Sequence, residues 1–399
     1  MSLSVSTKAE KVKPSSTLAI SAKANELKAQ GIDVVSFGAG EPDFNTPENV
    51  KEAAKKAIDE NKTKYTAAAG LPVLKQAVAD KFLRENNLKY ELNQIVISNG
   101  GKHTLTNAFQ AILNPEDEVI IPAPFWLSYP EMVKLCGGVP VVVKCDASQN
   151  YKITAEQLAA ACNEKTKAFV LTSPSNPTGM VYTKEELEAL AKVIVEKDIY
   201  VISDEIYEAL VYDGKEHVSI ASLNDEIYKH TITCNGMAKK YAMTGWRIGY
   251  CGAPANVAKL MSSIQSHQTS NPNTVAQWAT IEALNGPQDS VAAMKKEFDA
   301  RRLVMFDRIN KMPHVSMLKP EGAFYAFVDC HKALGMSHKG TKISDISVFA
   351  KILIEEYNVA VIPCVDFGFD DHIRLSYATS IEAINKGLDR IENFLNTLE

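Results

Sequence analysis

The stretch Tyr200-Val201-Ile202-Ser203-Asp204-Glu205-Ile206-Tyr207 decides the fold. A short run rich in apolar and β-branched residues that ends abruptly in polar ones is typical of a buried strand. The acidic and aromatic side chains that follow would lie at the carboxyl end of this strand. Open α/β sheets bind their ligands at that end. The stretch therefore predicts both a sheet and the edge of the sheet that carries the site.

Similar apolar runs occur on both sides of this stretch. They predict further buried strands at 95–98, 118–122, 139–143, 168–171 and 231–234. Segments with helical periodicity alternate with them, at 104–113, 129–136, 154–163 and 184–197. This alternation predicts an α/β sheet that is mostly parallel and has helices on both faces.

The pattern changes after about residue 285. A long helical segment at 288–312 is followed by strands near 324–329, 359–362 and 372–377 and by helices at 344–357 and 381–397. This order predicts a smaller α+β domain, which the helical segment 16–30 is expected to join. We therefore expect a large domain of residues 49–285 and a small domain made of residues 1–48 together with 286–399.

Composition excludes several classes of function. The net charge of -5 offers no basic surface for nucleic acid. A continuous apolar run of membrane-spanning length and the apolar core of a signal peptide are both missing, so neither a membrane protein nor export is expected. The seven cysteines are scattered without a C-x-x-C pair, which favours reduced thiols and a cytoplasmic protein. His103 and His267 lack metal-ligand spacing, and no metal site is expected.

Three predicted strand ends carry unusual polar residues. They are Ser173–Gly179, Asp204–Tyr207 and the segment 235–249, which contains Lys239 and Arg247. Small residues flank Lys239, so its amine can be desolvated, which lowers its pKa and makes it nucleophilic towards aldehydes. Arg247 is a plausible clamp for a phosphate. Together these two residues suggest a lysine that holds pyridoxal phosphate as a Schiff base.

Motifs along nearly the whole chain support this hypothesis by their order and spacing. They are Gly38-Ala39-Gly40-Glu41-Pro42-Asp43-Phe44, Lys62-Thr63-Lys64-Tyr65, Ser173–Gly179, Asp204–Tyr207, Lys239–Gly249 and Ile373-Arg374-Leu375-Ser376-Tyr377-Ala378. In these motifs the chain resembles the fold-type I pyridoxal-phosphate aminotransferases of the aspartate aminotransferase class. It is most similar to their bacterial-type branch, Ib. The resemblance implies a seven-stranded-type large-domain sheet and a small domain that closes over the active site.

The resemblance also implies roles for the residues that contact the cofactor ring. Asp204 would keep the pyridine nitrogen protonated, and Tyr207 and Asn176 would bind the ring's phenolic oxygen. Trp126 would lie flat on the ring. Lys239 would carry the cofactor and later move a proton from the substrate Cα. Taken alone, Asp204 could equally be a helix cap, Asn176 a turn residue and Trp126 a core residue.

The cofactor phosphate is expected at the turn Gly100-Gly101-Lys102, with Arg247 as its counter-charge. Tyr65 matches a family tyrosine that reaches the phosphate from a second subunit, which implies a homodimer whose active site is completed by the neighbour. One departure stands out. Many relatives have serine three residues before the lysine, whereas this chain has Gly236, and Ala238 also lacks a hydroxyl. One or two phosphate hydrogen bonds are therefore expected to be missing.

Substrate recognition is expected at Arg374, which matches the family's clamp for the α-carboxylate, near Gly40 and Asn176. No arginine occurs between Arg247 and Arg301 to bind a second carboxylate. The bacterial-type branch uses a lysine for this purpose, which corresponds to Lys102, assisted by hydroxyls that correspond to Ser15 and Thr17. Lys102 could instead face only the phosphate or the solvent.

Acidic substrates are therefore expected: aspartate and 2-oxoglutarate, giving oxaloacetate and glutamate. The alternatives on the same fold are an aromatic, alanine or prephenate aminotransferase, or a pyridoxal-phosphate-dependent carbon-sulfur lyase. A different class of protein, a cofactor-binding regulator without turnover, is disfavoured because Asp204, Tyr207, Lys239 and Arg374 are all intact.

Overall fold

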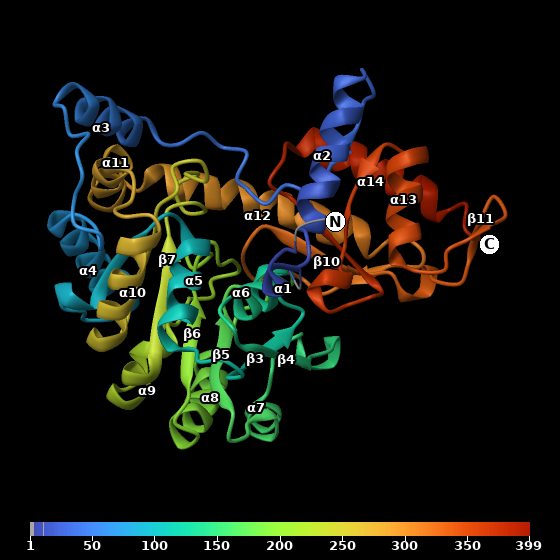
Figure 1. Cartoon of the computed structure of the whole chain (residues 1–399). Coiled ribbons are helices and arrows are strands. Elements are labelled where there is room, and N and C mark those ends of the chain that lie inside the picture. The colour runs from blue at the N-terminus through green and yellow to red at the C-terminus, as the bar shows by residue number, and fades with distance from the viewer. Residues whose placement is uncertain (1–3, 11) are drawn as a thin grey trace.

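The computed structural model describes residues 4–10 and 12–399. Its centre is a seven-stranded sheet in the order β2-β8-β7-β6-β5-β3-β4 (Figure 1). Six of its strands coincide with the predicted runs: β2 (Ile95–Ser98), β3 (Glu118–Ala123), β4 (Val139–Lys144), β5 (Thr166–Thr172), β6 (Tyr200–Asp204) and β7 (Thr231–Gly236). Neighbouring strands from β7 to β4 are parallel, which confirms the predicted fold class.

The seventh strand, β8 (Gly249–Gly252), was not predicted. It runs antiparallel between β2 and β7. Its two glycines weaken the strand signal in the sequence. The structure explains one of them, because a Cβ atom on Gly249 would lie 2.4 Å from the carbonyl carbon of Gly100. Close contact between β8 and the turn after β2 therefore requires a glycine at the point where the sequence argues against a strand.

Helices cover both faces of this sheet because successive strand residues point to opposite sides. Val119 and Ile121 pack into one core cluster with α5 (Gly101–Ile112), α6 (Ser128–Leu135) and α10 (Ala255–Gln268). Ile120, between them, packs into another with α7 (Ala155–Ala161), α8 (Lys184–Glu196) and α9 (Asp225–His230). A third cluster holds α3 (Glu48–Asp59), α4 (Pro72–Asn86) and α11 (Thr274–Asn285) beyond β2 and β8.

A second, four-stranded sheet lies beside the first in the order β14-β15-β10-β9. Its antiparallel strands are β9 (Ser316–Met317), β10 (Tyr325–Asp329), β14 (Ile362–Pro363) and β15 (His372–Ser376). The helices α12 (Asp289–Ile309), α13 (Ile346–Glu356) and α14 (Ile381–Leu395) share one hydrophobic core with this sheet. Figure 1 shows the long α12 running from the seven-stranded part towards this second part.

The remaining short elements complete the second part. The predicted strand near 359–362 is split into β13 (Val359–Ala360) and β14, because β13 pairs in parallel with β1 (Val35–Ser36) while β14 pairs with β15. β11 (Ser337–His338) and β12 (Thr341–Lys342) form a small hairpin. The helix α2 (Ser16–Ala29) contacts β1, β13 and β14, while the preceding α1 (Thr7–Glu10) contacts α6 of the large sheet.

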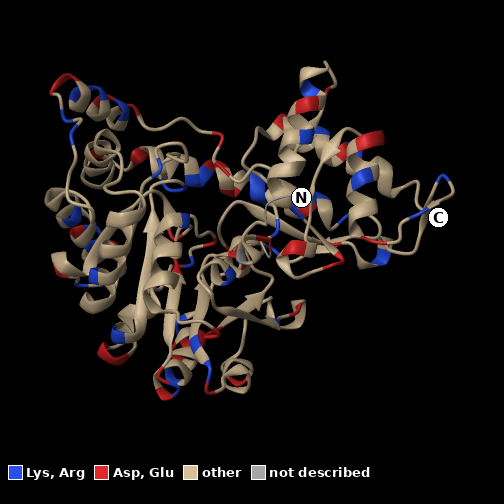
Figure 2. Cartoon of the chain, viewed as in Figure 1, with Lys and Arg blue, Asp and Glu red and all other residues tan. Residues whose placement is uncertain are grey.

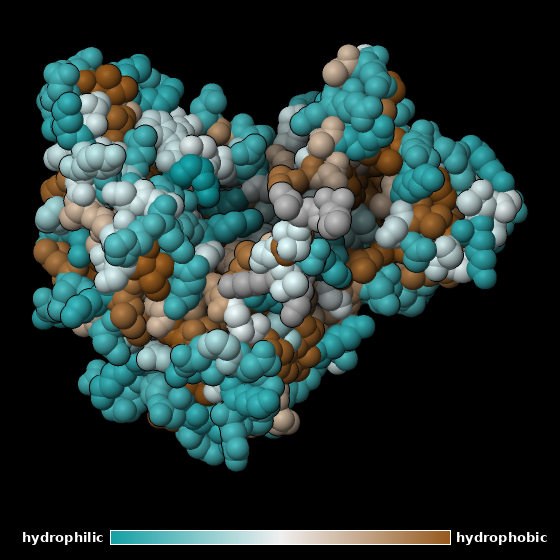
Figure 3. Space-filling model, in the orientation of Figure 1, coloured by the Kyte–Doolittle hydropathy of each residue, from teal (hydrophilic) through white to brown (hydrophobic). Residues whose placement is uncertain are grey.

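The surface gives little further indication of a partner. Figure 2 shows acidic and basic residues interspersed along both parts of the molecule. Within residues 4–10 and 12–399, no helix is long and apolar enough to cross a membrane. Figure 3 shows a hollow in the surface between the seven-stranded part and α2.

Candidate active site

A cavity of about 410 Å³ lies where the carboxyl ends of β5, β6 and β7 face the four-stranded sheet. Most of the residues predicted from the sequence line it: Ser15, Thr17, Gly40, Gly101, Lys102, Trp126, Asn176, Asp204, Tyr207, Lys239, Arg247 and Arg374. Tyr65 and Gly100 do not. Strands far apart in the sequence thus bring one set of polar side chains together, as expected for the carboxyl edge of an open α/β sheet.

Asp204 lies at the end of β6 and is buried. The Tyr129 hydroxyl donates to one of its carboxylate oxygens at 2.6 Å, and the Ile206 backbone N–H donates to the other at 3.2 Å. Burial raises the pKa of Asp204 above its ordinary value. Among the described residues Asp204 forms no ion pair, so this buried carboxylate can accept a cationic N–H, such as that of a protonated pyridine ring.

The Lys239 amine donates a hydrogen bond to the Gly40 carbonyl oxygen. It lies 5.8 Å from the ring centroid of Tyr207 and 5.6 Å from that of Phe324. Burial, reinforced by the positive charge of Arg374, lowers the pKa of Lys239 to about 8. More of the amine is therefore neutral near physiological pH than in an ordinary lysine, and the neutral amine is the form that attacks an aldehyde.

Arg247 and the turn before α5 form a cradle for an anion. Gly100 has φ of +90°, and a Cβ on it would lie 2.3 Å from a terminal guanidinium nitrogen of Arg247. The missing side chain therefore lets the guanidinium lie directly over the N-terminus of α5, which begins at Gly101. Helix N-terminal N–H groups and an arginine are together suited to a phosphate.

Arg374 on β15 is only 2% exposed. Its guanidinium donates to the Asn176 side-chain oxygen at 3.1 Å and to the Gly38 carbonyl at 3.3 Å, and its Nε has no hydrogen-bond partner within the described residues. Both acceptors are neutral. A buried guanidinium without an acidic partner is costly unless a ligand supplies one, so a carboxylate fits here.

Lys102 supplies a second cation to the same cavity. Its Nζ lies 5.0 Å from the Trp126 ring centroid, and burial together with the charge of Arg247 lowers its pKa. Lys102 forms no ion pair within the described part of the chain. The buried Thr17 hydroxyl is also unpartnered, whereas the Ser15 hydroxyl caps α2 by accepting from the Leu18 N–H at 3.4 Å.

Comparison with known proteins agrees with this geometry. The model of the family described as aminotransferase class I and II matches residues 32–391. The chain belongs to that family. An aspartate aminotransferase of a Bacillus species is 52% identical over 382 residues, 96% of each chain, and an aspartate/prephenate aminotransferase of Cereibacter sphaeroides is 48% identical over 386 residues, again 96% of each.

A solved structure shows the same similarity in three dimensions. The aspartate aminotransferase of Thermus thermophilus with maleate superposes with a TM-score of 0.93 at 44% identity, covering 99% of this chain and all of that one. Membership of the family makes this protein a pyridoxal-phosphate-dependent aminotransferase, as the sequence predicted. The unpaired carboxylate, the neutralisable lysine and the anion cradle described above are compatible with that cofactor.

Sequence reasoning missed two tyrosines that line the aminotransferase cavity, Tyr129 and Tyr325. Tyr129 bonds both Asp204 and, at 2.8 Å, the Thr172 hydroxyl. The Tyr325 hydroxyl lies 2.9 Å from that of Tyr207, and its ring is 4.4 Å from the Arg374 guanidinium. Neither belongs to a local motif. Only the position of Tyr129 just after the predicted strand 118–122 could have drawn attention to it.

The structure also accounts for the glycine that departs from the family serine. Gly236 ends β7 opposite Gly249, and a Cβ on Gly236 would lie 3.0 Å from the Ile248 carbonyl oxygen. At this end of the strand pair, β7 and β8 therefore lie closer together than a serine at position 236 would permit without a shift of the backbone.

Tyr65 lies outside the cavity and is 91% exposed. The loop that carries it is nevertheless anchored, since Thr274 donates to the Lys64 carbonyl at 2.8 Å and Gln265 donates to the Ala68 carbonyl at 2.6 Å. This exposed position on an anchored loop is compatible with the predicted contact of Tyr65 with a second subunit.

Proposed function

We propose that the chain transfers the amino group of aspartate to 2-oxoglutarate, giving oxaloacetate and glutamate. The observation that carries this proposal is that Arg374 and Lys102 line one cavity with Lys239 and form no ion pair among the described residues, in addition to Arg247, which is assigned to the phosphate. A dicarboxylic amino acid has one carboxylate for each of them. All four reactants named here share that pair of carboxylates.

Lys239 would hold pyridoxal phosphate as a Schiff base and, once the substrate has displaced it, move the proton from the substrate Cα. When bound, the cofactor supplies an electron-accepting ring that stabilises negative charge at Cα. Asp204 would keep a proton on the ring nitrogen, while Tyr207 and Asn176 would donate to the phenolic oxygen. The lowered pKa of Lys239 suits a base that works near neutral pH.

The phosphate would lie on Gly100, Gly101 and Arg247, with Trp126 stacked on the ring. Arg374 would bind the substrate α-carboxylate beside Gly40 and Asn176. Lys102 would bind the distal carboxylate, with help from Thr17 and Ser15. The Ser15 hydroxyl accepts the capping hydrogen bond of α2 and keeps its proton available to donate to a substrate oxygen.

We further propose a division into a large domain of residues 49–285 and a small domain of residues 1–48 and 286–399, of which residues 1–3 and 11 lie outside the described part. Arg374 and Gly40 belong to the small domain, so closing it would bring them onto the substrate. Tyr65 would reach the phosphate of a second copy in a homodimer. Six of the cysteines form no disulfide among the described residues, in keeping with a cytoplasmic location: Cys145, Cys162, Cys234, Cys251, Cys330 and Cys364.

The relatives support an acidic substrate. Maleate, present in the Thermus thermophilus structure, carries two carboxylates on a four-carbon chain. The name of the Cereibacter sphaeroides relative adds prephenate, which also has two carboxylates. Prephenate is therefore the second candidate, since the pair Arg374 and Lys102 would serve it as well.

Paired substitutions test the assignment. Lys102→Met should lower kcat/KM for aspartate by about 10–100-fold, the contribution of one charged hydrogen bond, and leave alanine within a few-fold. Arg374→Lys should lower kcat/KM for aspartate and kcat/KM for alanine on the order of 100-fold each, because both substrates have the α-carboxylate. An equal loss for aspartate and alanine in Lys102→Met would reject the acidic assignment. A kcat/KM for prephenate, phenylalanine or alanine that exceeds the value for aspartate would identify the corresponding aminotransferase. Release of pyruvate from cystathionine would identify a carbon-sulfur lyase.

A further inference from the structure

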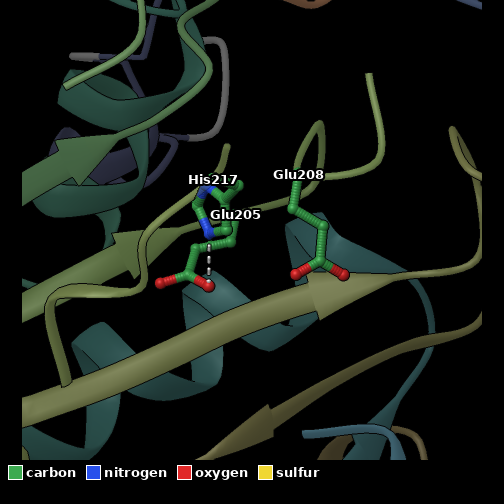
Figure 4. A group of neighbouring side chains, drawn as sticks. All are labelled: Glu205, Glu208 and His217. Atoms are coloured by element: carbon green, nitrogen blue, oxygen red, sulfur yellow. Dashed lines mark hydrogen bonds and ion pairs between the residues drawn. The ribbon is translucent and has the colours of Figure 1, made fainter. Parts of the chain in front are cut away.

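A buried cluster of charged side chains lies directly behind the segment that carries Asp204 and Tyr207. We call it the Glu205 cluster. Its members come from α4, from β6 and the turn after it, and from the loop before α9: Lys81, Asn86, Ser203, Glu205, Glu208, His217 and Ser219. Figure 4 shows Glu205, Glu208 and His217 within it. None of the seven lines the active-site cavity.

One half of the cluster neutralises Glu208. The Lys81 ammonium, which is fully buried on α4, donates to its carboxylate and forms an ion pair with it. Asn86 donates to the other carboxylate oxygen at 2.7 Å. Burial alone would raise the pKa of Glu208, but Lys81 and His217 outweigh burial and lower it to about 2. Glu208 is therefore charged and fixed.

The other half surrounds Glu205, which is only 1% exposed. Its carboxylate accepts from the hydroxyls of Ser203 at 2.9 Å and Ser219 at 2.7 Å, and lies 3.0 Å from His217 Nε2. Although burial opposes it, the charge of Glu205 raises the pKa of His217. With Lys81, a protonated His217 balances the two carboxylates.

The side chains of Glu205, Glu208 and His217 are of the types that ligate metal ions, and they lie close enough together to share one. The contacts argue for a different role. Lys81 already supplies the cation for Glu208, and both serine hydroxyls already saturate one oxygen of Glu205. Apart from His217 Nδ1, which has no hydrogen-bond partner among the described residues, the polar groups of the cluster are paired with one another. Such networks hold a segment in one position.

That segment is the end of β6. Side chains alternate along it, so Ser203 and Glu205 point into the cluster while Asp204 points towards the cavity. The Glu205 N–H continues the sheet ladder to the Cys234 carbonyl at 2.9 Å, and the Glu208 N–H closes a turn onto the Glu205 carbonyl at 3.0 Å. The backbone on both sides of the Asp204 carboxylate is thus tied to the cluster.

We propose that Glu205, held by Asn86, His217 and the two serines, is a positioning residue that aims the Asp204 carboxylate at the ring nitrogen of the cofactor. This inference rests on the proposed function, in which Asp204 meets that nitrogen. The physical reason is that a charged contact to a ring depends steeply on placement. A shift of about 1 Å can change a rate by about 100-fold.

The test compares two probes that differ at one atom: pyridoxal phosphate and its 1-deaza analogue, in which a C–H replaces the ring nitrogen. Dissociation constants of both are measured on the full-length apoprotein. For Glu205→Gln we expect binding of pyridoxal phosphate to weaken by about 10-fold, the lower range for one charged hydrogen bond, and binding of the analogue to change by less than 3-fold. A loss shared equally by both probes, or no loss, would overturn the proposal.

Two further variants serve as a substitute test and a negative control. Ser219→Ala removes a single donor to Glu205 and provides the test if Glu205→Gln does not fold. It should weaken binding of pyridoxal phosphate, but not of the analogue, by about 2–4-fold. Asp213→Asn breaks an ion pair with the fully buried Arg302. Among the described residues neither partner forms a hydrogen bond or ion pair with residues 204–208, so this variant should leave both dissociation constants unchanged. A selective loss in Asp213→Asn, or none in Ser219→Ala, would contradict a role specific to Glu205.

Asp204→Asn separates failure of this inference from failure of the proposed function. If Asp204 meets the ring nitrogen, this variant loses affinity for pyridoxal phosphate and keeps its affinity for the analogue. If Asp204→Asn binds the two probes as native protein does, the cofactor is not placed as proposed, and the inference falls with it. If Asp204→Asn is selective and Glu205→Gln is not, only the inference falls.

Discussion

The Tyr129 hydroxyl donates a 2.6 Å hydrogen bond to the Asp204 carboxylate at the floor of the cavity. Tyr129 is buried on α6 and holds its hydroxyl between Asp204 and Thr172. The bond stabilises the charged carboxylate against a burial that raises its pKa. Tyr129 therefore maintains the charge on which the predicted contact with the cofactor ring depends.

Replacing Tyr129 should reveal this dependence. For Tyr129→Phe we expect kcat/KM for aspartate to fall by about 10–100-fold, since a hydrogen bond to a charged group contributes about 1.5–3 kcal/mol. Steady-state kinetics measure the loss. Thr172→Val is the matched control, because it removes the other partner of the same hydroxyl and should have a clearly smaller effect. Equal losses in the two variants would show that Tyr129 acts through packing alone.

Two adjacent glycines give a second matched pair. In Gly100→Ala the new Cβ collides with the Arg247 guanidinium in a backbone with φ of +90°, whereas in Gly101→Ala it meets only Ile206 Cδ1 at 3.9 Å. We expect Gly100→Ala to weaken pyridoxal phosphate binding by about 10-fold or more, as strain at positive φ costs about 1–2 kcal/mol. Gly101→Ala should bind almost as native protein does. Titration of the two apoprotein variants with pyridoxal phosphate measures these affinities. Similar affinities for both variants would contradict the assignment of Gly100 to the phosphate site.

The lowered pKa of Lys239 makes apoprotein stability depend on pH. Between about 8 and the ordinary lysine value of 10.5, the unfolded chain binds more protons than the folded one, so stability rises with pH in this window. Below about pH 8 the folded protein bears the full free-energy cost of burying the charged Lys239 amine. Lys239→Met apoprotein should therefore be more stable than native apoprotein at pH 7, by a margin that shrinks at pH 10. Urea unfolding at both pH values measures this, and a margin independent of pH would contradict the lowered pKa.

The proposed contact of Tyr65 with the neighbouring subunit predicts that two inactive variants can complement each other in one dimer. If it completes the neighbour's site, a dimer of one Tyr65→Ala and one Lys239→Ala subunit contains one site with both native residues. Subunits refolded together in equal amounts should regain about one quarter of native activity, the value for random pairing in a two-fold dimer. Separately refolded subunits that are mixed without exchange are the control. Activity equal to the mean of the parents would mean that Tyr65 acts within its own chain or not at all.

The sequence predicted those parts of the molecule in which local pattern and burial agree. The central strands are continuous apolar runs because helices cover both of their faces, and polar residues at their ends stand out. β8 escaped prediction because close packing against Gly100 requires Gly249 where a strand would normally have a β-branched residue. The split of 359–362 between two sheets depends on pairing partners, β1 and β15, that lie far away in the sequence.

The site was predictable where family motifs carry it and hidden where only tertiary contact creates it. Lys239, Asp204 and Arg374 follow from motifs. Tyr129 and the Glu205 cluster depend on side chains of helices α6 and α4 that reach the residues at and just after the end of β6, which no local pattern encodes.

The most direct test of the central claim is the absorbance of the native holoenzyme on addition of aspartate alone. The account predicts that the long-wavelength absorbance of the lysine-bound cofactor disappears with release of one equivalent of oxaloacetate per site and returns when 2-oxoglutarate is added. Absorbance that persists with aspartate while a monocarboxylic amino acid abolishes it would contradict the account.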